Sequence, residues 1–211
     1  MALVSGSTAA TELTPFLNGQ RLGVVIKAIE LPATLPKDLV SGLTNKLLIR
    51  VALVSRSQVV DQKTAEVAVK YDLWDETFGV TLTVNEARVA AKTYTTVREV
   101  EAYFANMKLP GLFAQSAVPA GAHVTIRVEM LLNPIERERI EAIRKWVAEN
   151  STYTPSDITG FGGDKRVGSS RSNAIFNRIF DEYAQGKDLA ATWKEAVSSE
   201  PFNISEIGDD R

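Results

Sequence analysis

The stretch that decides the fold of this chain is Thr77-Phe78-Gly79-Val80-Thr81-Leu82-Thr83-Val84. Every second residue in it is bulky and apolar, and the residues between them are glycine or threonine. Side chains alternate between the two faces of a β-strand, so this period of two predicts a strand with one buried face. Phe78, Val80 and Leu82 are therefore predicted core residues, because the glycine and threonines between them cannot bury a comparable apolar area.

Other segments on both sides of this strand show the same alternation. They are residues 22–29, 47–54, 64–71, 88–94 and 123–131. Short polar turns separate several of these segments, as expected for hairpins. Together they predict a mainly β protein, an antiparallel β-sandwich of about seven or eight strands in residues 20–132.

Two sequence signals predict where helices interrupt or follow the strands. Thr96-Val97-Arg98-Glu99 has the spacing of a capping box, so one short inserted helix is expected, followed by a loop from Leu109 to His123. At Asn133-Pro134-Ile135-Glu136 the apolar period changes from two to about 3.6, and this motif is typical of a helix start.

A C-terminal helical tail is therefore expected beyond the sandwich. The sequence predicts an amphipathic helix over 133–150, a Gly/Ser-rich linker over 151–172, and a helical hairpin and tail over 173–211. Leu189, Trp193, Ala196 and Val197 are assigned to the second helix of that hairpin.

The composition excludes several classes of chemistry. The 211 residues contain no cysteine and one histidine, His123, which excludes disulfides, thiolate zinc sites, iron–sulfur clusters and sites with two imidazoles. The net charge of −2 gives no field that would favour nucleic acid. No apolar run approaches the roughly 20 residues that span a bilayer, so a soluble chain is expected. No nucleophile or acid–base pair stands out, and we expect no enzymatic activity, no cofactor and no bound metal.

An acidic corner, Tyr71-Asp72-Leu73-Trp74-Asp75-Glu76, joins two of the predicted strands. Its three carboxylates are potential calcium ligands or a hydrolase acid–base pair. Calcium, however, takes about six to eight oxygens, and no second acidic loop is evident. The preferred interpretation is a structural corner with Trp74 packed against its neighbours.

About a third of the chain resembles the calcium- and lipid-binding sandwich domains of the synaptotagmin type. The similarity is carried by Leu22–Leu31, Leu47–Leu53, Lys63-Thr64 and Trp74-Asp75-Glu76-Thr77-Phe78. It implies a sandwich architecture and partner binding without calcium, because Asn45 stands where that family has an acidic pair and no Asp-x-Asp follows Val84. The whole pattern is also similar to uncharacterised bacterial envelope proteins with a β domain and a helical C-terminus.

The candidate partner-binding surface lies on the predicted tail. Its residues are Ile175, Phe176, Ile179, Phe180, Tyr183 and Trp193. They form a wider apolar face than one neighbouring element needs, so we expect the sandwich, a protein partner or a second copy of the chain to cover it. The chain is thus predicted to be a noncatalytic protein-interaction or assembly module. The alternative is a calcium-independent peripheral lipid-binding domain that uses the loops at 32–44 and 109–115.

Residues 1–19 are predicted to be a flexible N-terminal extension. The small residues from Ala2 to Ala10 resemble the end of a signal peptide, so a clipped signal peptide is the other interpretation. A clipped signal would indicate the periplasm or cell envelope, whereas the first interpretation is equally compatible with the cytoplasm.

Overall fold

The computed structural model describes residues 10–118, 121–134, 191 and 193–207. The chain divides into two compact units, one of residues 1–133 and 192–211 and one of residues 134–191. The predicted linker, nearly all of the predicted helix at 133–150 and the first helix of the tail lie outside the described residues.

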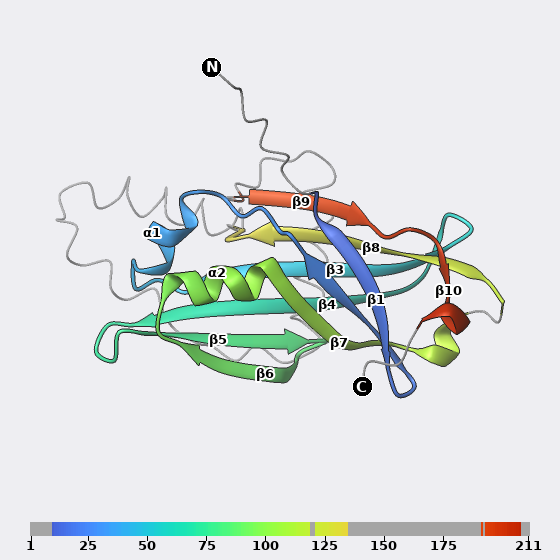
Figure 1. The fold of residues 1–211 in the computed structure, drawn as a ribbon, viewed down its shortest axis with the longest axis horizontal. Coiled ribbons are helices and arrows are strands. Elements are labelled where there is room, and N and C mark those ends of the chain that lie inside the picture. Colours follow the sequence, from blue (N-terminus) through green and yellow to red (C-terminus); the bar gives the residue numbers. More distant parts are fainter. Residues whose placement is uncertain (1–9, 119–120, 135–190, 192, 208–211) are drawn as a thin grey trace, which may run out of the picture. The chain divides into compact units, whose positions relative to one another are not determined.

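The described part of the first unit contains two antiparallel β-sheets (Figure 1). The larger sheet has the order β10-β8-β3-β4-β5-β6, and β9 pairs with β8. Its strands are β3 (Asn45–Ser55), β4 (Gln58–Asp72), β5 (Thr77–Val84), β6 (Ala87–Tyr94), β8 (His123–Leu132), β9 (Trp193–Ser198) and β10 (Phe202–Asn203).

The smaller sheet has the order β1-β2-β7. Its strands are β1 (Glu12–Asn18), β2 (Arg21–Lys27) and β7 (Asn106–Ala114). Two short α-helices, α1 (Leu35–Leu39) and α2 (Val97–Ala105), connect strands, and the 3-10 turns η1 (Gln115–Ala117) and η3 (Ile204–Glu206) follow β7 and β10. The prediction of a mainly β, antiparallel protein is confirmed.

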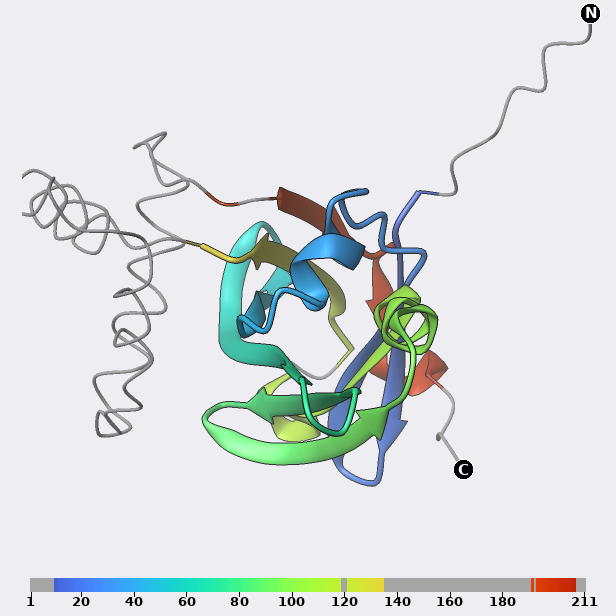
Figure 2. The same cartoon turned by 90° about the vertical axis from the view of Figure 1, so that its left-hand side faces the viewer.

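One hydrophobic cluster takes residues from both sheets. Phe78, Val80 and Leu82 of β5 are each 3% exposed, which confirms the face predicted from the alternation. Leu22 and Val24 of β2 contribute from the smaller sheet and are fully buried. Figure 2 shows how the strongly curved strands bring the two sheets around this common interior.

Helix α2 confirms the inserted helix. The Thr96 hydroxyl accepts from the backbone N–H of Glu99 at 3.2 Å, and the Glu99 carboxylate accepts from the N–H of Thr96 at 3.0 Å. These bonds form the predicted capping box. The pKa of Glu99 lies below its usual range, because its carboxylate accepts from the N–H and hydroxyl of Thr95 and, with a smaller effect, from those of Thr96. Val100 and Phe104 bury one face of the helix in the shared core.

Residues 12–18, assigned to a flexible extension, form β1 instead. This strand pairs with β2 in register from Glu12–Lys27 to Asn18–Arg21 and buries Leu13 and Phe16. Its turn contains Gly19 at φ +59°, a conformation that favours glycine. Gly19 stands first in the two-residue turn after Asn18, which is a hairpin signal, and the flexible assignment was wrong for residues 12–18.

The loop expected between Leu109 and His123 is also partly a strand, β7. Pro110 and Gly111 are typical of a loop and predicted that no strand would form here. Leu109, Leu112 and Phe113, however, are fully buried. The pairing with β2 shifts register between Leu22 and Val24, and Gly111 adopts φ +63°. A strand at a sheet edge tolerates proline at such an irregularity, because its outer N–H groups need no partner strand.

The helical assignment of the chain from Trp193 onward was wrong. Residues 193–198 form β9, which pairs with β8 from Leu132–Trp193 to Arg127–Ser198. The apolar spacing fits a helix as well as a strand, and pairing with β8 selects the strand. Beyond it, the Ser199 hydroxyl accepts from the N–H of Ile126 at 3.0 Å before β10 continues along the same edge.

Candidate functional site

Four exposed apolar side chains form the first candidate site, which we call the apolar loop cluster. It consists of Val40, Leu43, Leu73 and Trp74, which are 46%, 72%, 67% and 95% exposed. Val40 and Leu43 lie between α1 and β3, and Leu73 and Trp74 lie in the turn between β4 and β5. Contiguous exposed apolar side chains are uncommon on monomeric proteins and mark interaction surfaces.

The two loops lie together at one end of the larger sheet. A Cβ atom built on Gly42 would lie 3.6 Å from Cδ1 of Leu73, which is van der Waals distance. Figure 1 shows α1 and the β4–β5 turn at the same end of the strands. The cluster therefore joins two segments that are about 30 residues apart in the sequence.

The first loop is held by its attachment to the sheet. Leu35 and Leu39 of α1 are buried in the core, and Nδ2 of Asn45 donates to the carbonyl oxygens of Asp38 at 3.0 Å and Leu43 at 3.3 Å. Nδ2 of Asn133 in turn donates to Oδ1 of Asn45 at 2.7 Å. Asn45 thus fixes the backbone that presents Leu43.

The second loop is held by an Asx turn. Oδ1 of Asp72 accepts from the N–H groups of Trp74 at 2.9 Å and Asp75 at 3.3 Å. These two bonds, with a smaller effect of Lys70, hold the pKa of Asp72 below its usual range. The turn extends past the sheet with the Trp74 side chain in solvent, so the interpretation of a packed Trp74 was wrong. No described element covers the ring.

Carboxylates surround the apolar side chains of this turn. Asp72, Asp75 and Glu76 flank Leu73 and Trp74, and Lys70 is the one cation within the same seven residues. All four charged side chains are exposed. The part of the cluster on the β4–β5 turn is therefore an apolar tip with an acidic rim.

An open cleft near the C-terminal end of β5 is the second candidate site. Its volume is about 540 Å³, within the range of small-molecule sites. Its described lining residues are Asn18, Arg21, Val84, Asn85, Ala87, Val89, Pro110 and Gly111. They come from the β1–β2 hairpin, the β5–β6 hairpin and β7, so both sheets contribute to the cleft.

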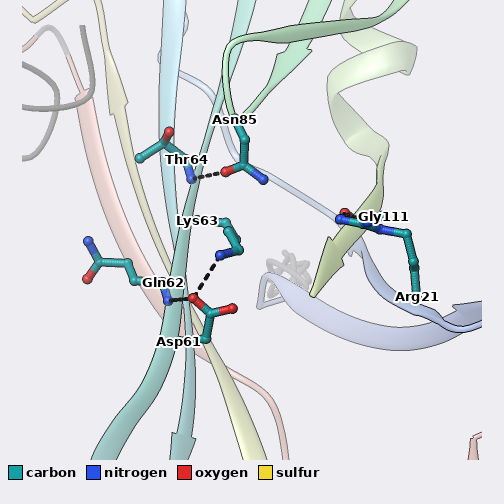
Figure 3. A network of polar contacts seen from close by, with 7 residues as sticks. All are labelled: Arg21, Asp61, Gln62, Lys63, Thr64, Asn85 and Gly111. Atoms are coloured by element: carbon teal, nitrogen blue, oxygen red, sulfur yellow. Dashed lines mark hydrogen bonds and ion pairs between the residues drawn. The ribbon is translucent and has the colours of Figure 1, made fainter. Parts of the chain in front are cut away.

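Polar contacts fix two sides of this cleft (Figure 3). Nε and Nη2 of Arg21 donate to the carbonyl oxygen of Gly111 at 3.1 and 2.9 Å. On the other side, the N–H of Asn85 donates to the Thr64 carbonyl at 2.8 Å, and its Oδ1 accepts from the Thr64 N–H at 3.3 Å. Figure 3 also shows the ion pair of Lys63 and Asp61 on β4, with Nζ and Oδ1 2.8 Å apart.

Of the predicted partner-binding residues, Trp193 alone lies in the described part of the chain. Ile175, Phe176, Ile179, Phe180 and Tyr183 lie outside the described residues, so their role stays a prediction. Trp193 lies on β9, half-buried against the shared core, and is not part of the apolar loop cluster.

Of the two loops predicted for lipid contact, only the first is exposed. The segment 32–44 presents Val40 and Leu43, whereas 109–115 is largely the buried strand β7. Within the described ranges, no group of three or more acidic or histidine side chains is placed to hold a metal ion. No helix in the same part of the chain is both long and apolar enough to cross a membrane. His123 is exposed at the start of β8.

Comparison of the chain with protein-family models, curated proteins and solved structures finds no match. The resemblance to sandwich domains of the synaptotagmin type therefore stays a prediction. The main surface residues that sequence reasoning missed are Leu43, Leu73 and Arg21. Leu43 and Leu73 carried a usable signal, because each is an apolar residue flanked by glycine, polar or acidic turn residues.

Proposed function

We propose that this chain is a noncatalytic protein-interaction module, built on a β-sandwich, that docks onto a partner through the apolar loop cluster. The observation that carries the proposal is the 95% exposure of Trp74 on a turn whose backbone is fixed by Asp72. Tryptophan is enriched among the residues that dominate binding energy. A fixed turn also limits the entropy lost when such a side chain is immobilised in an interface.

The acidic rim indicates what kind of partner would fit. Asp72, Asp75 and Glu76 surround the apolar tip, so the complementary surface is an apolar recess edged by lysine or arginine. The same carboxylates would be repelled by an anionic bilayer, which favours a protein over a lipid surface. Peripheral lipid binding remains the alternative because the exposed loop at 32–44 was predicted for it.

The predicted tail belongs to the same proposal as a further contact surface. Its apolar residues Ile175, Phe176, Ile179, Phe180 and Tyr183 would engage the same partner, a second copy of the chain or the sandwich itself. This part of the proposal rests on the helical spacing of the sequence alone.

Site-specific photo-crosslinking tests the loop cluster. A photoreactive residue in place of Trp74, in the full chain expressed in its native cell, should form a discrete adduct with one protein. The adduct should disappear when Leu43→Asp and Leu73→Asp are added, because they place charge in the apolar contact. The matched control carries the same photoreactive residue at Gln58, which is exposed at the far end of β4.

Equal adducts from positions 74 and 58, or an adduct that survives both aspartates, would contradict the proposal. Analytical ultracentrifugation of the purified chain shows whether the partner is a second copy. Flotation with zwitterionic and anionic vesicles tests the alternative, since flotation of the chain with the vesicles that depends on Trp74 would favour lipid.

The tail is tested by excision. Truncation after Asn150 would also remove β9 and β10, which complete the edge of β8. Leu132 and Trp193 are paired neighbours on adjacent strands, so a short Gly/Ser linker can replace residues 134–191 without moving the sheet. Retention of the position-74 adduct after this excision would assign the contact to the loop cluster, and its loss would assign the contact to the excised residues.

A further inference from the structure

The cleft between the two hairpins combines one cation with apolar walls. Arg21 is the only charged residue among its described lining residues, and it makes no ion pair in the described part of the chain. Val84, Ala87, Val89 and Pro110 supply the apolar surface. Val89 is 43% exposed although it is a β-branched apolar residue, so the cleft leaves apolar surface in water.

The guanidinium of Arg21 is held in place before any ligand arrives. Its Nε and Nη2 donate to the carbonyl oxygen of Gly111, and within the described residues its other N–H groups make no hydrogen bond. Gly111 can offer that carbonyl because it adopts φ +63°, where a larger residue would be strained. A fixed guanidinium presents a planar fork that suits a carboxylate better than a point charge does.

The neighbouring polar groups extend the same chemistry. Oδ1 of Asn85 accepts from Thr64, which leaves its amide N–H groups available to donate. Asn18 adds a second amide to the lining, and no described lining residue carries a negative charge. The donors therefore match a single anionic group attached to an apolar body.

The adjacent sheet edge is poorly suited to an added peptide strand. β6 carries Arg88 and Lys92, and its pairing with β5 shifts register between Leu82 and Thr83. Charged side chains and bulges are the usual devices that protect a sheet edge from strand addition. A small ligand held within the cleft fits these features better than an extended segment of another protein.

We infer that the cleft binds an aliphatic monocarboxylate, with its carboxylate on Arg21 and Asn85 and its chain along Val84, Ala87, Val89 and Pro110. One cation balances one carboxylate, whereas a phosphate monoester would bring a second charge with no second cation in the described lining. This site lies apart from the apolar loop cluster and does not depend on the proposed function.

Isothermal titration calorimetry of the full chain with octanoate tests the inference. Octanoate should bind saturably at one site. 1-Octanol and acetate should each bind at least roughly tenfold more weakly than octanoate, because octanol lacks the carboxylate and acetate lacks the aliphatic chain. Arg21→Gln should reduce the octanoate affinity roughly tenfold or more and leave octanol unchanged. Arg127→Gln, at an exposed arginine of β8 outside the cleft, is the matched control and should change neither.

A second variant keeps the test decisive if Arg21→Gln disturbs the contact with Gly111. Val89→Glu places a carboxylate in the wall at an exposed position, so the fold should tolerate it and octanoate should be repelled. Thermal unfolding of each variant checks the fold independently. The inference is overturned if octanol binds as tightly as octanoate, if octanoate shows no saturable binding, or if Val89→Glu leaves the octanoate affinity unchanged.

Discussion

Phe78 and Trp74 lie four residues apart on the same hairpin, and their surroundings are opposite. Phe78 is 3% exposed in the core shared by the two sheets, with its ring centroid 4.7 Å from that of Tyr71. Trp74 is 95% exposed on the turn that joins β4 to β5. Two large aromatic residues in one local segment thus divide between stabilising the fold and presenting a surface.

This difference indicates that substitutions in the turn and substitutions in the strand should have separate effects. The strand is fixed by its pairing on both sides, with Phe78 opposite Tyr71 on β4 and Tyr94 on β6. The turn is fixed locally by Asp72 and does not depend on the aromatic ring of Trp74. Substitutions in the strand should therefore affect stability, whereas substitutions in the turn should affect binding.

The largest effect is expected for Phe78→Ala. Removal of a fully buried phenyl ring should lower the free energy of unfolding by about 3–5 kcal/mol, through lost burial and the cavity left behind. Thr81→Ala, on the other face of the same strand, is the control and should cost well under about 1 kcal/mol. Chemical denaturation measures both, and equal losses would show that the face assignment is wrong.

The alternation that places Phe78 in the core could be read from the sequence because pairing of β5 on both sides enforces a period of two. The capping box of α2 was equally local, since Thr96 and Glu99 contact each other. Trp193 and Leu109 could not be placed in this way, because their strands are selected by distant partners on β8 and β2.

The candidate sites were harder to predict for a related reason. The exposure of Trp74 depends on whether another element of the fold covers the turn, and the residues of the turn do not determine this. The cleft depends on Arg21 meeting Gly111, 90 residues away along the chain. The sequence predicted a packed Trp74 and a partner-binding Trp193, and only the structure shows that the Trp74 ring is exposed and the Trp193 ring half-buried.

Trp193 is intermediate between Phe78 and Trp74 in the exposure of its ring. Its ring packs partly against the shared core, so Trp193→Ala should lower the free energy of unfolding by about 1–2 kcal/mol, less than a fully buried aromatic residue. A cost comparable to that of Phe78→Ala would mean that β9 is an essential part of the core. No measurable cost in denaturation would mean that β9 contributes little to the stability of the larger sheet.

Trp74→Ala should have a much smaller effect on stability, within about 0.5 kcal/mol, because the ring makes almost no contact in the isolated chain. Asp72→Ala is the informative companion, since it removes the acceptor for the N–H groups of Trp74 and Asp75 while the ring remains. Loss of partner binding in both variants with stability nearly unchanged would support separate roles for turn and strand. A large loss of stability for Trp74→Ala would instead place the ring in the fold.

The smallest effect is expected from calcium, which tests whether the acidic turn acts through a metal. The turn supplies three carboxylates, but Asp72 already accepts two backbone hydrogen bonds, and a calcium site needs about six to eight oxygens from several segments. Asn45, at the start of β3, uses its side chain to hold the carbonyl of Asp38 and to accept from Asn133. Because a ligand stabilises the folded state only if it binds that state, millimolar calcium should leave the melting temperature unchanged within about 1 °C. A rise of several degrees that Asp75→Asn abolishes would show that the turn is a metal site, and that calcium neutralises the acidic rim around Trp74.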